Sequence, residues 1–313
     1  MNANANANAN ANANANANAN ADANAGVSLQ FAGNRIRFNS YKIGRQAFDP
    51  NPPELIVPNR PARGYPGYDG TPSPGGHRHV RWDAEHKAWL YLREFVERRR
   101  NWFADMEKEA AGIWPGWKTT QELNDAALQI INAAGEREDR FAEILDQDPG
   151  EGCLNYWYGM LMVDAGRHPN TYLLIRVARK IGEMAVMCLK QHFNAARPSQ
   201  LCPAIVPMID PPCTASYPAG HALQAYLISF LLVRALPNVP QSSPAPTKWD
   251  STHTGLFALS RRVSDNRLIA GLHFDIDNEA GFLLAKKLDR MLGGLRGLRQ
   301  LLAAVREEFP QYR

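Results

Sequence analysis

Three segments in the second half of the chain carry the side chains that a site for a tetrahedral oxyanion needs. One lysine and two arginines offer charge-assisted donors to the outer oxygens of an anion. Two histidines and one carboxylate offer a nucleophile, an acid and an orienting group. The segments are Lys190-x6-Arg197-Pro198, Pro218-Ala219-Gly220-His221 and Arg267-x5-His273-x3-Asp277. Their combination predicts a pocket for a phosphate-shaped anion.

The first segment pairs a lysine with an arginine in a stretch of helical pattern. Apolar residues recur at helical spacing between Arg167 and Ala196. Lys190 and Arg197 are seven residues apart, which is two helical turns at about 100° per residue. We therefore expect both cations on one face of this helix, near its C-terminal end. Pro198 is expected to end the helix.

The second segment has the pattern of a helix start. Ser216-Tyr217-Pro218 precedes an apolar run from Ala222 to Leu236. Gly220 and His221 therefore fall in the first helical turn. Free backbone N–H groups and the helix dipole favour an anion there, and glycine permits its close approach. His221 is then placed beside the anion, where it can pass a proton.

The third segment contains a histidine and an aspartate one helical turn apart. The Asp277 carboxylate can then accept a hydrogen bond from one imidazole nitrogen of His273 and leave the other nitrogen free to attack. Arg267 precedes His273 by six residues, so an unbroken helix would direct the two side chains roughly 120° apart. Gly271 is expected to break the helix and let both face one pocket.

Each segment alone also has an ordinary structural explanation. An Arg-Pro pair is commonly a helix end with a solvated cation, and Pro-Ala-Gly-His is a turn that starts a helix. His273 and Asp277 could be a simple pair on a helix face. The occurrence of all three segments in this order favours the functional interpretation.

A metal site at the third segment is the competing interpretation of its acidic residues. His273, Asp275, Asp277 and Glu279 could bind a hard divalent cation through oxygen ligands. Alternate positions converge only on an extended segment, however, and these residues lead into a helical run. We therefore predict no metal here, and expect Asp275 and Glu279 to favour the helix N-terminus electrostatically.

In this order the segments resemble the signature of the type 2 phosphatidic acid phosphatase and vanadium haloperoxidase superfamily. Its usual form is Lys-x6-Arg-Pro, then Pro-Ser-Gly-His, then Ser-Arg-x5-His-x3-Asp. The match covers about 90 residues, from Lys190 to Asp277. This chain departs from the signature twice, since Ala219 replaces the serine of the second motif and Asn266 replaces the serine of the third.

The resemblance implies a role for each matching residue. His273 would form a phosphohistidine in a phosphatase, or hold vanadate in a haloperoxidase, with Asp277 orienting it. His221 would protonate the leaving oxygen and then activate water. The outer oxygens would be held by Lys190, Arg197, the Gly220 amide and Arg267. Loss of one comparable donor typically costs about 2.7–4 kcal/mol of barrier, so Ala219 predicts lower activity or an unusual substrate.

Three functions are compatible with these residues. The favoured one is an acid-phosphatase-like phosphomonoesterase that needs no cofactor and acts on a small phosphorylated substrate. The second is a vanadium-dependent haloperoxidase that takes vanadate, peroxide and bromide or iodide. The third is a non-catalytic oxyanion-binding protein. Met187 and Thr214 stand where chloroperoxidase-like members of the superfamily would carry bulky aromatic residues, which favours the phosphatase.

Composition limits the class of protein. The chain has 313 residues and 45% hydrophobic side chains, enough for one sizeable helical core. A net charge of +4 is too small to predict a nucleic-acid partner. No apolar run reaches the roughly 18–20 residues of a membrane span, because the best one, Ala222 to Leu236, is short and contains Gln224 and Arg234. With no secretory signal visible, we expect a cytoplasmic protein.

The chain divides by composition into three regions. We expect a disordered Asn-Ala repeat over 1–26, a Pro/Gly-rich arm over 27–80 and a helical catalytic domain over 81–313. The arm contains a short extended stretch, Val27 to Phe31. The predicted fold is all-α, a helical bundle of the acid phosphatase and vanadium haloperoxidase type with a non-helical N-terminal arm. The predicted helices are 82–111, 120–134, 136–147, 170–196, 219–236, 255–270 and, in pieces, 277–309.

Overall fold

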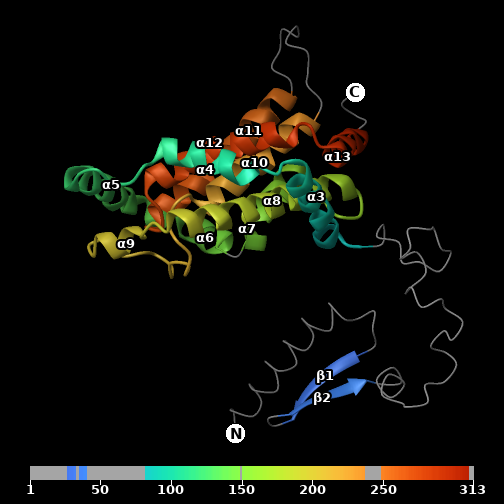
Figure 1. The fold of residues 1–313 in the computed structure, drawn as a ribbon, viewed down its shortest axis with the longest axis horizontal. Helices are drawn as coiled ribbons and strands as arrows, with labels where there is room; N and C mark the ends of the chain where they lie inside the picture. The colour runs from blue at the N-terminus through green and yellow to red at the C-terminus, as the bar shows by residue number, and fades with distance from the viewer. Residues whose placement is uncertain (1–26, 33–34, 41–81, 149, 237–247, 310–313) are drawn as a thin grey trace, which may run out of the picture. The chain divides into compact units, whose positions relative to one another are not determined.

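The computed structural model describes residues 27–32, 35–40, 82–148, 150–236 and 248–309 (Figure 1). The first two ranges form an antiparallel strand pair, β1 (Val27–Ala32) and β2 (Arg35–Ser40), with Val27 opposite Ser40. The extended stretch predicted from Val27 is thus part of a strand. The Asn-Ala repeat and most of the predicted arm lie outside the described residues, so their boundaries remain predictions.

The described residues from 82 to 309 are mainly helical, which confirms the all-α fold, and a longer connection over 202–219 joins α9 to α10. The first helices are α3 (Ala84–Arg98), α4 (Trp102–Ile113), α5 (Thr120–Ala133), the 3-10 turn η2 (Ala134–Glu136), α6 (Arg137–Gln147) and α7 (Gly150–Leu161). The later ones are α8 (Pro169–Phe193), α9 (Pro198–Leu201), α10 (Gly220–Ala235), α11 (Lys248–Ile269), α12 (Asp275–Leu292) and α13 (Arg296–Glu307).

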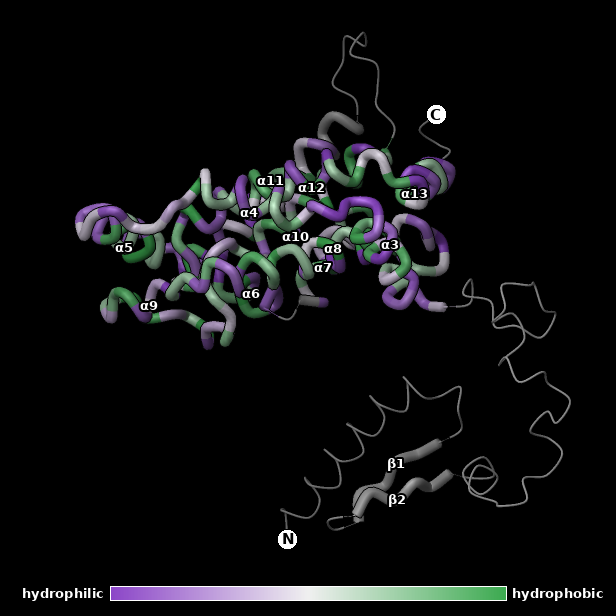
Figure 2. The backbone as a smooth tube through the Cα atoms, viewed as in Figure 1, coloured by the Kyte–Doolittle hydropathy of each residue, from purple (hydrophilic) through white to green (hydrophobic). Residues whose placement is uncertain are grey.

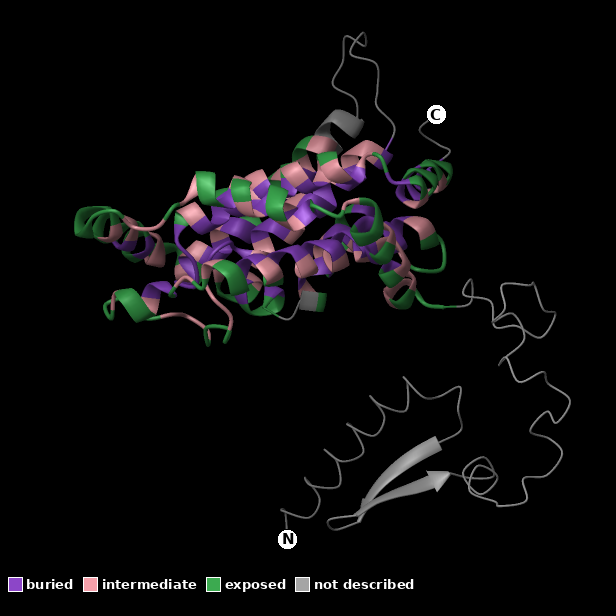
Figure 3. Ribbon diagram, in the orientation of Figure 1, coloured by how far each residue is buried: buried purple, intermediate pink, exposed green. Residues whose placement is uncertain are grey.

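Helix α10 is the centre of the helical part. It packs against α8, α11 and α12, and the three neighbours surround it in Figure 1. It is largely hydrophobic (Figure 2), and the buried residues gather along it (Figure 3). A helix that is apolar on all sides belongs in the interior of a protein. The predicted apolar run from Ala222 therefore forms the core element.

Two glycines let the neighbouring helices approach α10 closely. A Cβ atom added to Gly281 of α12 would lie 2.6 Å from Ala222 Cβ and 3.0 Å from Leu223 N. On the opposite side, a Cβ on Gly182 of α8 would lie 3.2 Å from Leu223 Cδ2. These contacts fix the first turn of α10 between α8 and α12. The three helices each carry residues of the predicted site, Lys190 on α8, Gly220 and His221 on α10, and Asp277 on α12.

The helix boundaries differ from the sequence prediction at several positions. Helix α11 begins at Lys248, earlier than the predicted residue 255, and the short helix α9 was not predicted. The predicted helix 82–111 is two helices, with a break after Arg98. The predicted helix 170–196 ends at Phe193, because Asn194 adopts the left-handed conformation (φ 45°) that commonly terminates helices. Helix α7 was not predicted, and its buried Trp157 donates from Nε1 to Ser229 Oγ at 3.0 Å. The predicted helix over 277–309 is in pieces, as expected, since α12 ends at Leu292 and α13 begins at Arg296.

Candidate active site

A buried histidine and aspartate form the centre of the site. Helix α11 ends at Ile269, and Gly271 reverses the chain with a φ of 77°, so the predicted break is present. His273 lies in the following loop, before α12. The helical spacing of His273 and Asp277 predicted both on a helix, and this was wrong for His273. Asp277 lies in the first turn of α12. His273 Nδ1 nevertheless donates to Asp277 Oδ2 at 3.2 Å.

The pair forms because Asp277 satisfies the start of its own helix. Its Oδ2 accepts a hydrogen bond from the Phe274 backbone N–H at 3.0 Å. A carboxylate that receives such a bond at a helix N-terminus is held in one orientation. The loop that contains His273 is thereby folded back over the first turn of α12. The helical spacing of His273 and Asp277 predicted their contact. The contact forms because the Asp277 carboxylate caps the start of α12.

Ser216 is a third member of this group that sequence reasoning did not identify. Its hydroxyl donates to Asp277 Oδ2 at 2.6 Å, and its Oγ lies 3.3 Å from His273 Nδ1. Its backbone N–H donates to Ala195 O at 2.9 Å, which anchors it. The sequence placed Ser216 just before a helix start, and we interpreted it only in that way.

Burial changes the titration of both members of the pair. It raises the pKa of Asp277 to about 6, against the opposing effect of the Ser216 hydrogen bond. Burial, followed by the charges of Lys190 and Arg197, holds the pKa of His273 well below its usual value. At neutral pH the carboxylate is therefore ionised and the imidazole is neutral. With its proton on Nδ1, His273 has an unprotonated Nε2 that can act as a nucleophile.

Arg197 contacts the nucleophilic side of His273. Its Nη1 lies 3.3 Å from His273 Nε2 and donates to Leu272 O at 3.0 Å. Its Nε donates to Thr214 O at 2.9 Å. We predicted that Arg197 lies on the helix of Lys190, and this prediction was wrong. Arg197 precedes α9 in an extended conformation. The left-handed turn at Asn194 redirects the chain and brings the guanidinium to the histidine.

Lys190 reaches the same region from the last turn of α8. Its Nζ donates to the backbone oxygens of Ala215 and Ser216, the second at 2.7 Å. Burial and the charge of Arg197 lower its pKa to about 7. Lys190 and Arg197 thus fasten the segment that carries Ser216, and both place positive charge beside His273.

His221 lies where the sequence predicted it, in the first turn of α10. Its Nε2 donates to Gln147 O at 3.0 Å, since a carbonyl oxygen can only accept. Nδ1 is then the unprotonated nitrogen of the neutral ring. Burial, together with the charge of Arg267, lowers the pKa of His221 to about 3. In the free site this side chain is therefore neutral and a weak base.

Gly220 is the first residue of α10, also as predicted. The first N–H groups of a helix have no partner within the helix. The preceding residue, Ala219, makes no side-chain hydrogen bond to them, and its own N–H donates to Asp277 O at 3.0 Å. The turn therefore presents backbone donors close to the aspartate and histidine.

Arg267 is fully buried at the end of α11, with Nη2 3.2 Å from Ile144 O. Its Nη1 lies 4.0 Å from an Asp148 carboxylate oxygen. Within the part of the chain that the structure describes, its Nε and Nη1 atoms have no hydrogen-bond partner. An unpaired buried donor costs about 1–3 kcal/mol. Retaining such donors beside two histidines is what an anion site requires.

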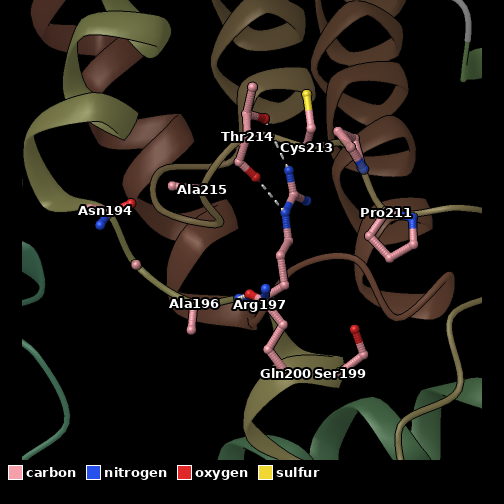
Figure 4. A pocket seen from close by; sticks show the side chains of 11 residues that line it. Asn194, Ala196, Arg197, Ser199, Gln200, Pro211, Cys213, Thr214 and Ala215 are labelled. Carbon is pink, nitrogen blue, oxygen red and sulfur yellow. Dashed lines mark hydrogen bonds between the residues drawn. The ribbon is translucent and has the colours of Figure 1, made fainter.

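A pocket of about 510 Å³ opens beside Arg197 (Figure 4). Its walls come from 194–197, 199–200 and 211–215. Figure 4 shows the Arg197 guanidinium directed at Thr214, with Cys213 next to it. The lining includes the polar residues Asn194, Ser199, Gln200 and Thr214. A small polar molecule in this pocket would meet the guanidinium that contacts His273.

The four residues considered for a metal site do not converge. His273 and Asp277 are buried together, whereas Asp275 and Glu279 are exposed and line a separate pocket of about 420 Å³ with Trp114 and Trp117. Over the described ranges, no three His, Cys, Asp or Glu side chains are grouped so that they could hold a metal ion.

Comparison with known proteins gives one kind of match. No family model matches the chain, and no curated protein matches it in sequence. Among solved structures, the chain is similar to a transmembrane PAP2 type phosphatidylglycerolphosphate phosphatase from Bacillus subtilis. The two share 17% identity over 67% of this chain and 94% of that chain, with a TM-score of 0.28. At this identity and score the family has to be inferred from the site itself.

The same finding corrects one prediction. The structure found to be similar is that of a transmembrane protein, which contradicts the cytoplasmic localisation predicted from the sequence, and we withdraw that prediction. It rested on the absence of a long apolar run, which does not assign a compartment. Among the helices described, none combines the length and hydropathy needed to cross a bilayer.

Proposed function

We propose that this chain is a phosphomonoester hydrolase of the type 2 phosphatidic acid phosphatase superfamily that acts through a phosphohistidine at His273. The observation that carries the proposal is the buried His273–Asp277 pair, 3.2 Å apart, with Arg197 at 3.3 Å from the free imidazole nitrogen. The carboxylate holds the proton on Nδ1, and the cation attracts a phosphate to Nε2.

In the first step, Nε2 of His273 attacks phosphorus and the bond from phosphorus to the ester oxygen breaks. His221 gives a proton to the departing oxygen, so that an alcohol leaves. To do so it must first gain a proton on Nδ1. Burial and, after it, the positive charge of Arg267 lower the pKa of His221 in the free site. A bound phosphate dianion favours protonation because it offsets the charge of Arg267.

In the second step, His221 removes a proton from water as the water attacks phosphorus. The bond between phosphorus and Nε2 breaks, and inorganic phosphate leaves with neutral His273 restored. Asp277 stabilises the imidazole throughout by accepting the hydrogen bond from Nδ1. Lys190, Arg197, Arg267 and the Gly220 amide would hold the outer oxygens of the five-coordinate phosphorus. Positive donors fixed before the reaction supply most of such catalysis.

The polar pocket beside Arg197 could hold the alcohol portion of a small phosphorylated substrate, although Arg197 is the one residue of the proposed reaction among the described residues that line it. Its walls carry amide and hydroxyl groups, which can hydrogen-bond a polar alcohol portion.

A haloperoxidase would use the same residues, with vanadate held by His273 and the three cations. The cationic donors and the unprotonated imidazole nitrogen fit vanadate as well as phosphate. The experiment that separates the two is an acid- or base-quenched reaction with a substrate carrying labelled phosphate. The proposal predicts a label on His273 that is stable to base and lost in acid. Rapid hydrolysis with no labelled protein at any quench time would contradict it.

A further inference from the structure

Gln147, the last residue of α6, contacts two members of the proposed site and is fully buried. Its backbone oxygen accepts the hydrogen bond from His221 Nε2 at 3.0 Å. Its side-chain Oε1 lies 3.4 Å from Arg267 Nη2. A single residue therefore holds the predicted acid and lies beside the predicted anion-binding arginine.

The surrounding donors fix which way the Gln147 amide points. A guanidinium can only donate, so the amide oxygen must be the atom that faces Arg267. Asn266 Nδ2 donates to the same oxygen at 3.0 Å. The orientation of Asn266 is fixed in turn, because its Oδ1 accepts from Arg140 Nη1 and its Nδ2 also donates to Glu143 Oε2, both at 3.1 Å. The NH2 group of Gln147 is thus the end of the amide that these partners leave unbonded.

That NH2 group has no hydrogen-bond partner among the described residues, although it is buried. The same holds for Nε and Nη1 of the adjacent Arg267. Buried donors are nearly always paired, and an unpaired one calls for an explanation. The side chains of Gln147 and Arg267 are in contact, and both have unpaired donors. This arrangement indicates that one acceptor is shared between them. The acceptor that satisfies a guanidinium and an amide together is an oxyanion.

We propose that the side-chain amide of Gln147 is an additional donor to the bound oxyanion and replaces the serine hydroxyl that Ala219 lacks. Asn266, which stands in place of the second missing serine, holds the amide oxygen and so directs the donor. The two departures from the superfamily signature are then linked through one residue. This inference rests on the proposed function.

Two substitutions at Gln147 separate donation to the anion from a merely structural role. Gln147→Glu keeps an oxygen for Asn266 and Arg267 but loses the donor, and Gln147→Met loses both. We expect kcat on p-nitrophenyl phosphate to fall about 10²–10³-fold in both variants. Affinity for orthovanadate should fall at least about tenfold, with the unfolding temperature of Gln147→Glu in the absence of ligand close to that of the unsubstituted protein. Gln300→Met, an exposed glutamine on α13, is the matched control and should change neither.

Restoring the serine is the second test. Ala219→Ser should raise the activity of Gln147→Met at least about tenfold and change the unsubstituted protein less than about threefold. The inference is overturned if Gln147→Glu keeps kcat and vanadate affinity within about threefold. It is also overturned if Ala219→Ser strongly raises the activity of the unsubstituted protein and does not restore the activity of Gln147→Met. If the unsubstituted protein neither hydrolyses the substrate nor binds vanadate, the proposed function fails, and this inference fails with it.

Discussion

The Oδ2 atom of Asp277 accepts hydrogen bonds from His273 Nδ1 at 3.2 Å and from Ser216 Oγ at 2.6 Å. One carboxylate oxygen therefore orients both the proposed nucleophile and the segment that precedes α10. Because Lys190 and Arg197 bind the backbone of that same segment, the nucleophile and the cations are positioned by one connected network. We expect substitutions in this network to lower the rate of catalysis more strongly than they disturb the fold.

Removal of the nucleophile should abolish turnover. We expect His273→Ala to lower kcat on p-nitrophenyl phosphate by about 10³-fold or more, because no other side chain takes its place. Circular dichroism should show the same helix content. The matched control is His86→Ala, since His86 also pairs with an aspartate, Asp83, but on the exposed surface. Comparable loss in both variants would remove the assignment of His273.

Removal of the Ser216 hydroxyl should shift the pH dependence of the reaction. The Ser216 hydrogen bond favours the ionised form of Asp277 and so lowers its pKa, which burial raises to about 6. In Ser216→Ala the pKa of Asp277 should rise further, and the acid limb of the kcat profile should move to higher pH. The loss of activity is therefore expected to be larger at pH 5 than at pH 8. An equal loss at all pH values would argue against this role.

Removal of the proposed acid should depend on the leaving group. For His221→Ala we expect about 10²–10⁴-fold loss on alkyl phosphates, whose alkoxides need protonation. The loss on p-nitrophenyl phosphate should be much smaller, because nitrophenolate is a stable leaving group. Equal losses on both substrates, measured as kcat/KM, would count against proton transfer by His221.

Anion affinity should fall as pH rises through the pKa of Lys190, about 7 in the free site. An anion binds the protonated lysine more tightly, so loss of the proton between pH 7 and pH 9 weakens binding. Sulfate is the suitable probe because its charge is constant over this range. Inhibition by sulfate should weaken with rising pH, and Lys190→Gln should bind it less well but with a flatter profile. A profile of unchanged slope in the variant would exclude Lys190 as its source.

Much of the site could be predicted from the sequence because motif order and local pattern carried the information. The start of α10 at Gly220 and the chain reversal at Gly271 follow from local residue preferences. The prediction that Lys190 and Arg197 share a helix was wrong, since the conformation of a single residue, Asn194, ends α8 early.

The contributions of Ser216 and Gln147 could not be predicted in the same way. Ser216 meets Asp277 across 61 residues of sequence, and Gln147 meets His221 across 74. Neither contact has a local pattern, because it depends on how α6, α10 and α12 pack together. The sequence identified the charged groups, and only the tertiary structure shows which neutral groups orient them.

The most direct test of the phosphatase proposal is hydrolysis of p-nitrophenyl phosphate by the full chain, with and without orthovanadate, beside His273→Ala and His86→Ala. We predict hydrolysis that orthovanadate inhibits, that His86→Ala retains and that His273→Ala loses. No hydrolysis by the unsubstituted protein, followed by bromide oxidation with peroxide after addition of vanadate, would contradict the phosphatase and establish the haloperoxidase. Hydrolysis that survives in His273→Ala would contradict the phosphohistidine mechanism.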